Sequence, residues 1–282
     1  MQLGIHAYAW CSVWSNDTLD LIDRAQNAGL DFLEIPLMVP ELFDFKAVKD
    51  RLKINNFKAV TSTVLSEGTD ISSDDESLRN NGISYLKKCI QFSHEIEAST
   101  FSGVIYSQHV KNSKSRPGLS QWQASANALR EVARYAQELG VTIALEPVNR
   151  YETNLINTCD QALEMIKLID EDNVKIHLDS YHMNIEEKSF YESTLLAGNR
   201  LVHYHLCEND RGIPGTGLVD WDGIFKALKE LNYQGNAALE SFVDITNNMN
   251  TWVWRQLAPS GDLLIEYGVN FIRKMQNKYG LK

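Results

Sequence analysis

Short apolar runs alternate with longer amphipathic stretches from one end of this chain to the other. The short runs predict buried strands. The longer stretches, in which apolar residues recur every three or four positions, predict helices between them. Strands that alternate with helices in this way form parallel βαβ units. Strands are expected at Leu3–Ala7, Phe32–Pro36, Lys58–Thr63, Thr100–Ile105, Thr142–Glu146, Val174–Asp179, Leu201–His205 and Ala237–Glu240.

Residues typical of helix ends support the borders of the expected helices. Asp17 is placed to cap the first helix, and a glycine follows the end of that helix. Thr158 and Gln161 have the spacing of a capping box, and Gly140 ends a long helix directly before the fifth strand. Helices predicted on these grounds include Thr18–Ala28, Leu78–Glu95, Ser120–Leu139, Cys159–Ile169 and Trp221–Leu231.

The number and spacing of the units favour a closed barrel over an open sheet. Eight units of roughly 35 residues each are typical of a (β/α)8 TIM barrel. The chain has 282 residues and 44% hydrophobic content, which suffices for one large core. No low-complexity linker interrupts it, so residues 1–282 are expected to form a single catalytic domain. The region Ser107–Leu119 lacks a clear period, which predicts a loop over the mouth of the barrel.

Several expected strands end in a side chain that can bind a metal or move a proton. TIM-barrel enzymes place their chemistry at these carboxyl ends. Strands five to eight adjoin one another, so their terminal side chains should converge, and three carboxylates with one imidazole are costly to bury together without a cation. The oxygen-rich set predicts one divalent ion, Mn²⁺, Mg²⁺ or Co²⁺. The strand-end residues are Glu34, Glu146, Asp179, His205 and Glu240.

Other residues admit both a functional and a structural interpretation. Glu34 lies on the opposite side of the barrel, where it either contacts the pocket or forms a structural pair. His177 and His203 should point inward but deeper than the strand-end residues, as buried supporting histidines. Trp14 and Tyr8 near the first strand are placed to stack on a sugar, although aromatic residues more often lie in a core.

The glycine-rich stretch 211–217 follows the seventh strand. Barrel enzymes often bind phosphate with the loops after strands seven and eight, so this stretch is a candidate phosphate site. It lacks a Walker pattern, which makes that indication weak.

Charge and cysteine content exclude several classes of protein. A net charge of −10 and a pI near 5.2 argue against nucleic acid as a partner. The four cysteines lie far apart with no CxxC pair, so neither a zinc ribbon nor a disulfide framework is indicated, and a reducing cytosol fits best. The amino-terminal segment has no signal-peptide pattern, and no apolar run is long enough to span a membrane. A cytoplasmic protein is expected.

Four segments of the chain resemble the ketose 3-epimerase family, which lies within the xylose-isomerase-like TIM-barrel superfamily. Its members include D-tagatose, D-psicose (allulose) and L-ribulose 3-epimerases. The likeness covers nearly the whole chain, and the run DSYHMNIEE at 179–187 is its most specific part. The four segments are EPVNRYETN at 146–154, HLDSYHMNIEE at 177–187, HYHLCENDRGIPGTG at 203–217 and ALESF at 238–242.

The resemblance implies a role for each matched residue. The family's metal, usually Mn²⁺ or Co²⁺, would be held by Glu146, Asp179, His205 and Glu240. The two glutamates would also act as the acid–base pair that removes and returns the C3 proton. Substrate contacts would fall on Glu152, His182 and Arg211. A homodimer or homotetramer is expected.

The chain departs from the family in the loop after the fourth strand. Several members have a tryptophan there, whereas this chain has Tyr106-Ser-Gln-His109. A tryptophan would supply a large apolar face for the distal carbons of a ketose. His109 is smaller and polar, so we expect the far end of the pocket to be less enclosed. Ribulose should then be handled at least as well as fructose or allulose.

Three alternatives remain open on the sequence alone. An aldose–ketose isomerase would use the same ene-diol chemistry. A metal-dependent endonuclease of the same superfamily would need more histidine and aspartate ligands and a basic groove, which seven histidines and the acidic balance disfavour. A non-catalytic sugar-binding barrel should have lost a metal ligand, and all four ligand residues are present.

Overall fold

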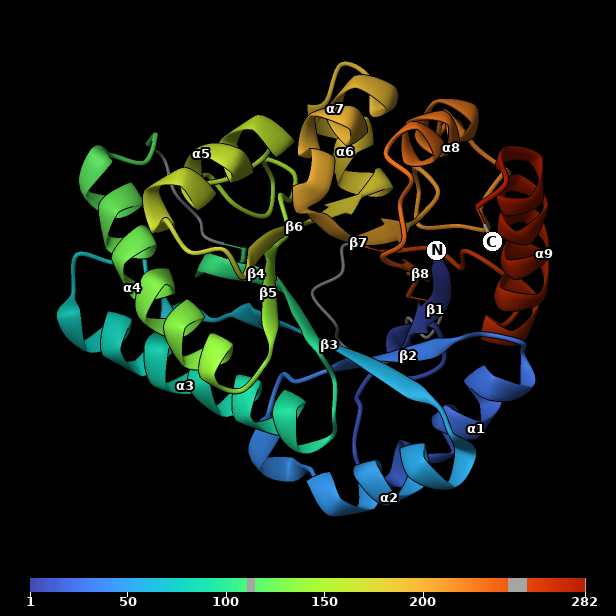
Figure 1. Ribbon diagram of the computed structural model, residues 1–282, viewed down its shortest axis with the longest axis horizontal. Helices are drawn as coiled ribbons and strands as arrows, with labels where there is room; N and C mark the ends of the chain where they lie inside the picture. Colours follow the sequence, from blue (N-terminus) through green and yellow to red (C-terminus); the bar gives the residue numbers. More distant parts are fainter. Residues whose placement is uncertain (111–114, 243–252, 282) are drawn as a thin grey trace.

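The computed structural model describes residues 1–110, 115–242 and 253–281. Its parallel strands follow one another in chain order around a closed barrel, and β8 pairs with β1 (Figure 1). The predicted (β/α)8 fold is therefore confirmed. The strands are β1 (Gln2–His6), β2 (Phe32–Pro36), β3 (Lys58–Leu65), β4 (Thr100–Gln108), β5 (Thr142–Leu145), β6 (Val174–Asp179), β7 (Leu201–Leu206) and β8 (Asn236–Leu239).

Helices form a ring around the barrel, and short 3-10 turns occupy several of the connections (Figure 1). The described helices are α1 (Asp20–Asn27), α2 (Phe45–Asn55), α3 (Glu76–Glu95), α4 (Leu119–Glu138), α5 (Cys159–Ile169), α6 (Ser180–Glu186), α7 (Phe190–Ala197), α8 (Trp221–Glu230) and α9 (Gly261–Tyr279). The 3-10 turns are η1 (Ala7–Ala9), η2 (Asn16–Thr18), η3 (Pro40–Leu42), η4 (Glu67–Thr69) and η5 (Gly198–Arg200).

Local polar contacts explain where the helices begin and end. Thr158 and Gln161 form the capping box predicted for α5. Gly140 follows α4 with a φ of +70°, the left-handed conformation that favours glycine after a helix. The prediction for Asp17 is wrong. Asp17 lies inside the turn η2, which is capped by Ser15, and α1 begins only afterwards without a side-chain cap.

Several strand ends that border the cavity differ from prediction. Strands β5 and β8 end at Leu145 and Leu239, so Glu146 and Glu240 lie one residue beyond them and not within the strands. Strand β1 ends at His6, one residue earlier than expected, so an imidazole stands at its carboxyl end. Strand β4 continues through Gln108, so Ser107 belongs to the strand and not to the loop that was predicted to start there. Residues 111–114 of that predicted loop lie outside the described residues.

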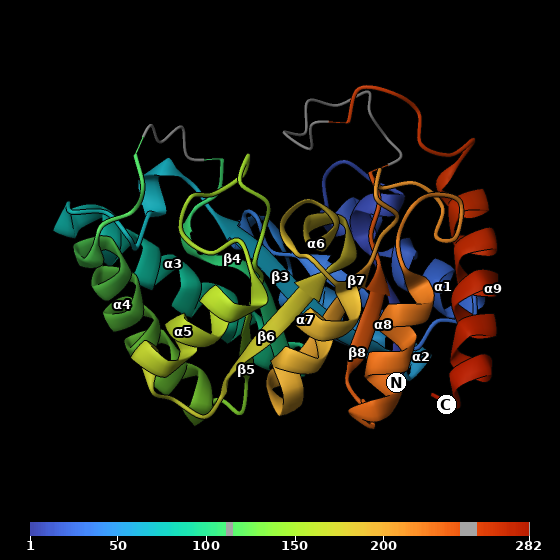
Figure 2. The same cartoon turned by 90° about the horizontal axis from the view of Figure 1, so that it is seen from above.

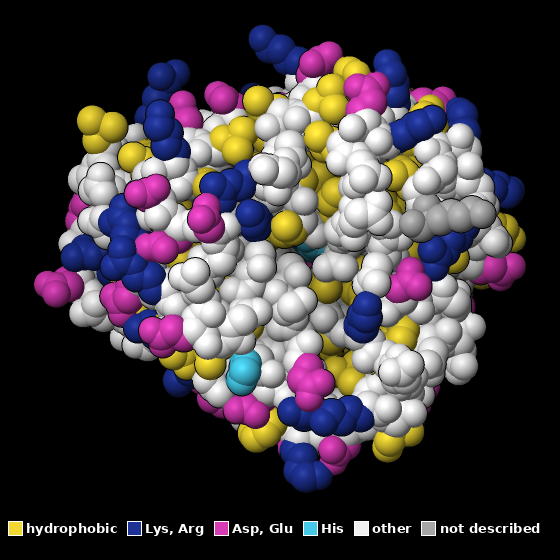
Figure 3. Space-filling model, in the orientation of Figure 1, with side chains coloured by type: hydrophobic (Ala, Val, Ile, Leu, Met, Phe, Trp, Pro, Cys, Tyr) yellow, Lys and Arg dark blue, Asp and Glu magenta, His cyan; other side chains and the backbone are white. Residues whose placement is uncertain are grey.

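The loops that follow the strands gather at one end of the barrel, and both chain termini lie at the other end (Figure 2). On the face shown in Figure 3, acidic side chains lie among basic ones over the outer helices and do not gather in one region. No helix within the described ranges combines the length and the apolar character that crossing a bilayer requires.

Candidate active site

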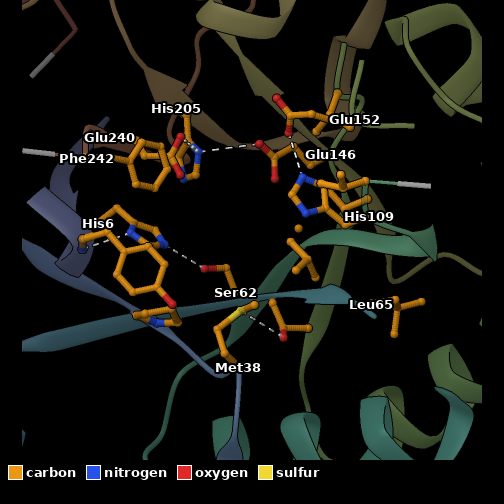
Figure 4. A pocket seen from close by; sticks show the side chains of 18 of the residues that line it. His6, Met38, Ser62, Leu65, His109, Glu146, Glu152, His205, Glu240 and Phe242 are labelled. Carbon is orange, nitrogen blue, oxygen red and sulfur yellow. Dashed lines mark hydrogen bonds and ion pairs between the residues drawn. The ribbon is translucent and has the colours of Figure 1, made fainter. Parts of the chain in front are cut away.

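A cavity of about 530 Å³ opens at the carboxyl ends of the strands (Figure 4). That size is within the usual range for small-molecule sites. Most of the residues predicted to act on a substrate line this cavity, although they come from loops and strands far apart in the sequence. They are Tyr8, His109, Glu146, Glu152, His182, His205, Arg211 and Glu240.

The ends of β5 to β8 bring three carboxylates around one imidazole nitrogen. His205 Nδ1 lies 3.3 Å from Glu240 Oε2, 3.7 Å from Glu146 Oε1 and 3.7 Å from Asp179 Oδ2. Strand register places Asp179 directly beside His205 across β6 and β7. The predicted convergence of these four side chains is therefore present.

The chemistry of this donor set fits a metal ion. His205 Nδ1 is buried and has no hydrogen-bond partner among the described residues. A buried nitrogen without a partner is unusual in a folded protein unless water, an ion or a ligand completes it. Arg211 supplies one positive charge beside Asp179 and Glu240, which is less than the three surrounding carboxylates carry together. One divalent cation would meet both needs.

Glu34, which lies deeper in the barrel, fixes the orientation of the His205 ring through a hydrogen bond. His205 Nε2–H and His203 Nε2–H donate to Glu34 Oε2 at 2.9 and 2.8 Å. Because Nε2 donates to Glu34, Nδ1 is the nitrogen that faces the three carboxylates and is left for a metal. Without a metal, burial acts to lower the pKa of His205, but Glu240, Glu34 and Asp179 outweigh it and hold that pKa well above its usual value.

Glu34 lies in the middle of β2 and not, as was predicted, at a strand end. It is fully buried and does not line the cavity, so it forms a structural pair and makes no contact with the pocket. His177 and His203 lie deep and fully buried, as expected.

The pKa values of Glu146 and Glu240 are shifted in opposite directions in this cluster. Burial raises the pKa of Glu146 well above its usual range, and the negative charges of Glu240 and Asp179 add to the effect. Burial also acts to raise the pKa of Glu240, but Arg211 and His205 together hold it well below its usual range. Two carboxyl groups with separated pKa values are a recurrent arrangement for an acid and a base.

Arg211 reaches into the cavity from the β7–α8 loop and is almost fully buried. Its Nη1–H donates to Asp179 Oδ2 at 2.7 Å and also to Glu240 Oε2. Its guanidinium stacks over the Tyr181 ring at 4.1 Å. Arg211 has a φ of +66°, which costs energy in a non-glycine residue, and Ser241 Oγ–H donates to its carbonyl at 2.6 Å. The loop is therefore built to present this one side chain.

Glu208 organises the same loop and was missed in the sequence. It is fully buried and accepts hydrogen bonds from the backbone N–H groups of Gly215 and Val219 and from Trp221 Nε1–H. Two N–H groups of the glycine-rich loop and its flank are thus directed at a carboxylate. The candidate phosphate site at 211–217 gains no support, because an anion already belonging to the protein occupies these donors.

Glu152, His109 and His182 form a polar group on one side of the cavity. Glu152 Oε2 lies 2.8 Å from His109 Nε2 (Figure 4), and Asn149 Nδ2–H donates to Glu152 Oε1 at 2.8 Å. Burial acts to raise the pKa of Glu152, but His182 and His109 outweigh it and lower that pKa to about 2. His109 therefore stands beside a fixed carboxylate.

Two further placements differ from the sequence-based expectation. Trp14 is 2% exposed and packs in the core outside the cavity, the common fate of a large aromatic ring. His6 and Phe242 line the cavity but were not predicted to do so. Phe242 lies two residues after Glu240 in the segment ALESF.

Comparison with known proteins identifies the family. A family model described as a xylose isomerase-like TIM barrel matches residues 22–275. The L-ribulose 3-epimerase of Methylomonas sp. (strain DH-1) is 37% identical over 97% of each chain. The ketose 3-epimerase of Arthrobacter globiformis is 36% identical over 97% of this chain and 96% of its own. The chain belongs to the ketose 3-epimerase family.

Solved structures agree with membership of the ketose 3-epimerase family. The D-allulose 3-epimerase from Methylomonas sp. in complex with D-allulose has a TM-score of 0.94 at 35% identity, covering 98% of this chain and 97% of that one. The resemblance found in the sequence is thus confirmed. The strand ends of this chain carry buried groups that are able to hold a metal ion. Glu146, Asp179 and His205 are one such group, and their ligand atoms lie within 4.8 Å of one another.

Proposed function

We propose that this protein is a metal-dependent ketose 3-epimerase in which residues 1–282 act as one catalytic domain. It inverts C3 of unphosphorylated ketoses by removing the C3 proton and returning it to the opposite face. The observation that carries the proposal is the convergence of Glu146 and Glu240 on His205 Nδ1 within the cavity. Full-length similarity to proteins named L-ribulose and ketose 3-epimerase supports the same reaction.

Glu146, Asp179, His205 and Glu240 would hold one divalent ion. Mn²⁺ suits this set best, with Co²⁺ and Mg²⁺ as alternatives, because the donors are mostly carboxylate oxygens with one imidazole nitrogen. When bound, the ion supplies Lewis-acid stabilisation of the negative charge that develops on the ketose oxygens as the proton leaves. Glu34 prepares His205 for this role by fixing its tautomer.

Inversion needs two proton-transferring groups, one on each face of the sugar. The C3 hydrogen is acidic because it lies next to the C2 carbonyl, and its removal gives an ene-diolate. Glu146 and Glu240 follow β5 and β8, the outer members of the four strands that carry the cluster. One carboxylate takes the proton and the other, as a carboxylic acid, returns one.

Arg211, His182 and Glu152 would hold the carbonyl end of the ketose and fix which carbon lies between the two glutamates. Arg211 and His182 are linked directly, since Arg211 Nη2 lies 3.2 Å from His182 Nε2. Because the four cysteines are free thiols, action in a reducing cytoplasm is expected. The expected assembly is a homodimer or homotetramer.

A ketose panel with Mn²⁺ present tests the substrate class. Ribulose should be turned over with a kcat/KM at least equal to those of fructose and allulose. The difference should be graded, since one missing contact is typically worth about 1–3 kcal/mol. A ketose phosphate should be poor, because Arg211 already faces two carboxylates and the loop amides face Glu208. Product chromatography gives the rates, with Glu240→Gln as the blank.

Two outcomes of this panel would correct the proposal. A ketose phosphate with the highest kcat/KM would preserve the epimerase reaction but overturn the substrate class. Turnover of fructose without turnover of ribulose would overturn the expected ranking of ribulose. Because His109 pairs with Glu152, it lies at the carbonyl end of the ketose in this arrangement and not beside the distal carbons, where the sequence placed it.

A further inference from the structure

His6 and Ser62 form a polar pair on the cavity wall that no step of the proposed reaction uses. His6 ends β1 and Ser62 lies in β3, and both are nearly buried, at 4% and 7% exposed. Figure 4 shows the two side chains pointing toward one another, with His6 Nε2 3.4 Å from Ser62 Oγ. That distance is at the long limit of a hydrogen bond, so the contact leaves both groups incompletely satisfied.

The backbone fixes which nitrogen of His6 carries the hydrogen. Tyr8 N–H donates to His6 Nδ1 at 3.2 Å, as part of the cap of the turn η1. Nδ1 therefore keeps its lone pair, and the hydrogen of the neutral ring is on Nε2. The nitrogen beside Ser62 is a donor as a consequence. Ser62 Oγ can accept, and the described residues give it no hydrogen-bond partner besides His6.

One hydroxyl group would complete this pair. Its oxygen would accept from His6 Nε2–H, and its own hydrogen would be donated to Ser62 Oγ. An alcohol can make both contacts at once, because its oxygen accepts and its O–H donates. A site with a buried donor and acceptor also rejects an analogue without the hydroxyl, because both groups then stay unpaired.

The position of the pair indicates which hydroxyl it meets. Glu152 and His109 lie across the cavity from His6 and Ser62 (Figure 4). The His6 ring meets the His205 ring edge-on at a centroid distance of 5.9 Å, so the pair borders the acidic cluster. With the carbonyl end of a ketose near Glu152 and C3 at the cluster, the rest of the sugar extends toward this wall.

We propose that His6 and Ser62 bind a hydroxyl carried on C5 or C6 of the ketose and thereby set the preference among ketoses of different length. The assignment rests on the proposed function for the placing of C3. It adds a contact that the strand-end acids and Arg211 do not supply, on the wall across the cavity from His109 (Figure 4).

Two substitutions of His6 separate its two nitrogens. His6→Asn keeps an acceptor for Tyr8 N–H where Nδ1 stood but removes the donor at Nε2. His6→Gln is long enough to carry an amide N–H near the Nε2 position. The substrates to compare are fructose and erythrulose, a ketotetrose whose chain ends at C4. For His6→Asn, kcat/KM should fall about 10- to 100-fold more with fructose than with erythrulose.

His6→Gln should recover most of that selectivity, and Ser62→Ala should show a smaller loss of the same kind. The loss should fall mainly on KM, because the contact lies away from C3. Equal losses on both sugars, or no loss on either, would overturn the proposal. Metal content and Tm are measured for each variant, since His6 borders His205.

Binding isotherms for the same two sugars keep this test independent of turnover. If the wild-type protein epimerises neither sugar, the proposed function fails. In that case the hydroxyl site is supported if His6→Asn weakens binding of fructose more than binding of erythrulose, and it is overturned if the two sugars are affected equally.

Discussion

Replacing Glu146 or Glu240 with glutamine is expected to lower kcat by several orders of magnitude. Glutamine keeps the length and the hydrogen-bonding capacity of the side chain, but it cannot take up or return a proton. General acid–base groups typically contribute on the order of 10²- to 10⁴-fold, and loss of either one stops inversion because each face of the sugar needs its own group. Steady-state kinetics with ribulose and fructose give the effect.

Both glutamates are also expected to hold the metal, so metal content must be measured in each variant. A loss of activity at full metal occupancy assigns the effect to proton transfer. Glu67→Gln is a matched control, because Glu67 is an exposed carboxylate that also lines the cavity. It should keep most of the wild-type activity. A Glu146→Gln or Glu240→Gln variant with near wild-type kcat would remove that residue from the acid–base pair.

Removal of the divalent metal is expected to abolish activity and lower the thermal stability. Without the metal ion, three buried carboxylates surround His205 Nδ1 at 3.3 to 3.7 Å, and Arg211 pairs with only two of them. An ion that binds only the folded state stabilises it by about 2.7 kcal/mol at a concentration one hundred times its Kd. For a chain of 282 residues that corresponds to a Tm shift of roughly 5 °C.

The measurement is activity and Tm after EDTA treatment and dialysis, then after addition of Mn²⁺, Co²⁺ or Mg²⁺. Activity should return, most fully with Mn²⁺. The matched variant is Asp179→Asn, which weakens the ligand set without removing either proton-transferring group and should need more Mn²⁺ for the same Tm. Full activity in a sample shown to be metal-free by elemental analysis would contradict the metal assignment.

The barrel and its acidic cluster follow from the sequence because parallel strands impose a repeating pattern. Each strand is an apolar run, and the first polar residue after it stands at the carboxyl end of the barrel. The bounds of β2 and β6 were predicted to the residue. Glu146, Asp179, His205 and Glu240 lie at or within one residue of the ends of four adjacent strands, so they come together without any knowledge of loop structure.

His6 was missed through an error of one residue at the end of β1. The strand was drawn to Ala7, which made an alanine its final residue, whereas β1 ends at His6. Apolar Ala7 continues the hydrophobic run, but it belongs to the turn η1. The general rule about strand ends would have found His6 had the boundary been right.

Glu34, Glu208 and His109 show what a single sequence does not reveal. The partners of Glu34 are His203 and His205, more than 160 residues away and across the barrel interior. Glu208 is bound by the N–H groups of a loop whose path has no period. The position of His109 after β4 was predicted, but its direction depends on Glu152, 43 residues later. In each case closure of the barrel or a loop path decides the contact.

Turnover in D₂O is the most direct measurement of proton transfer at C3. Fructose is incubated with the Mn²⁺-loaded protein in D₂O, and the product is examined by NMR. The two-glutamate reaction predicts the C3 epimer with deuterium at C3, because the proton on a carboxyl group exchanges with water before it is returned. A C3 epimer without deuterium at C3 would contradict this, and an aldose labelled at C2 would show aldose–ketose isomerisation instead.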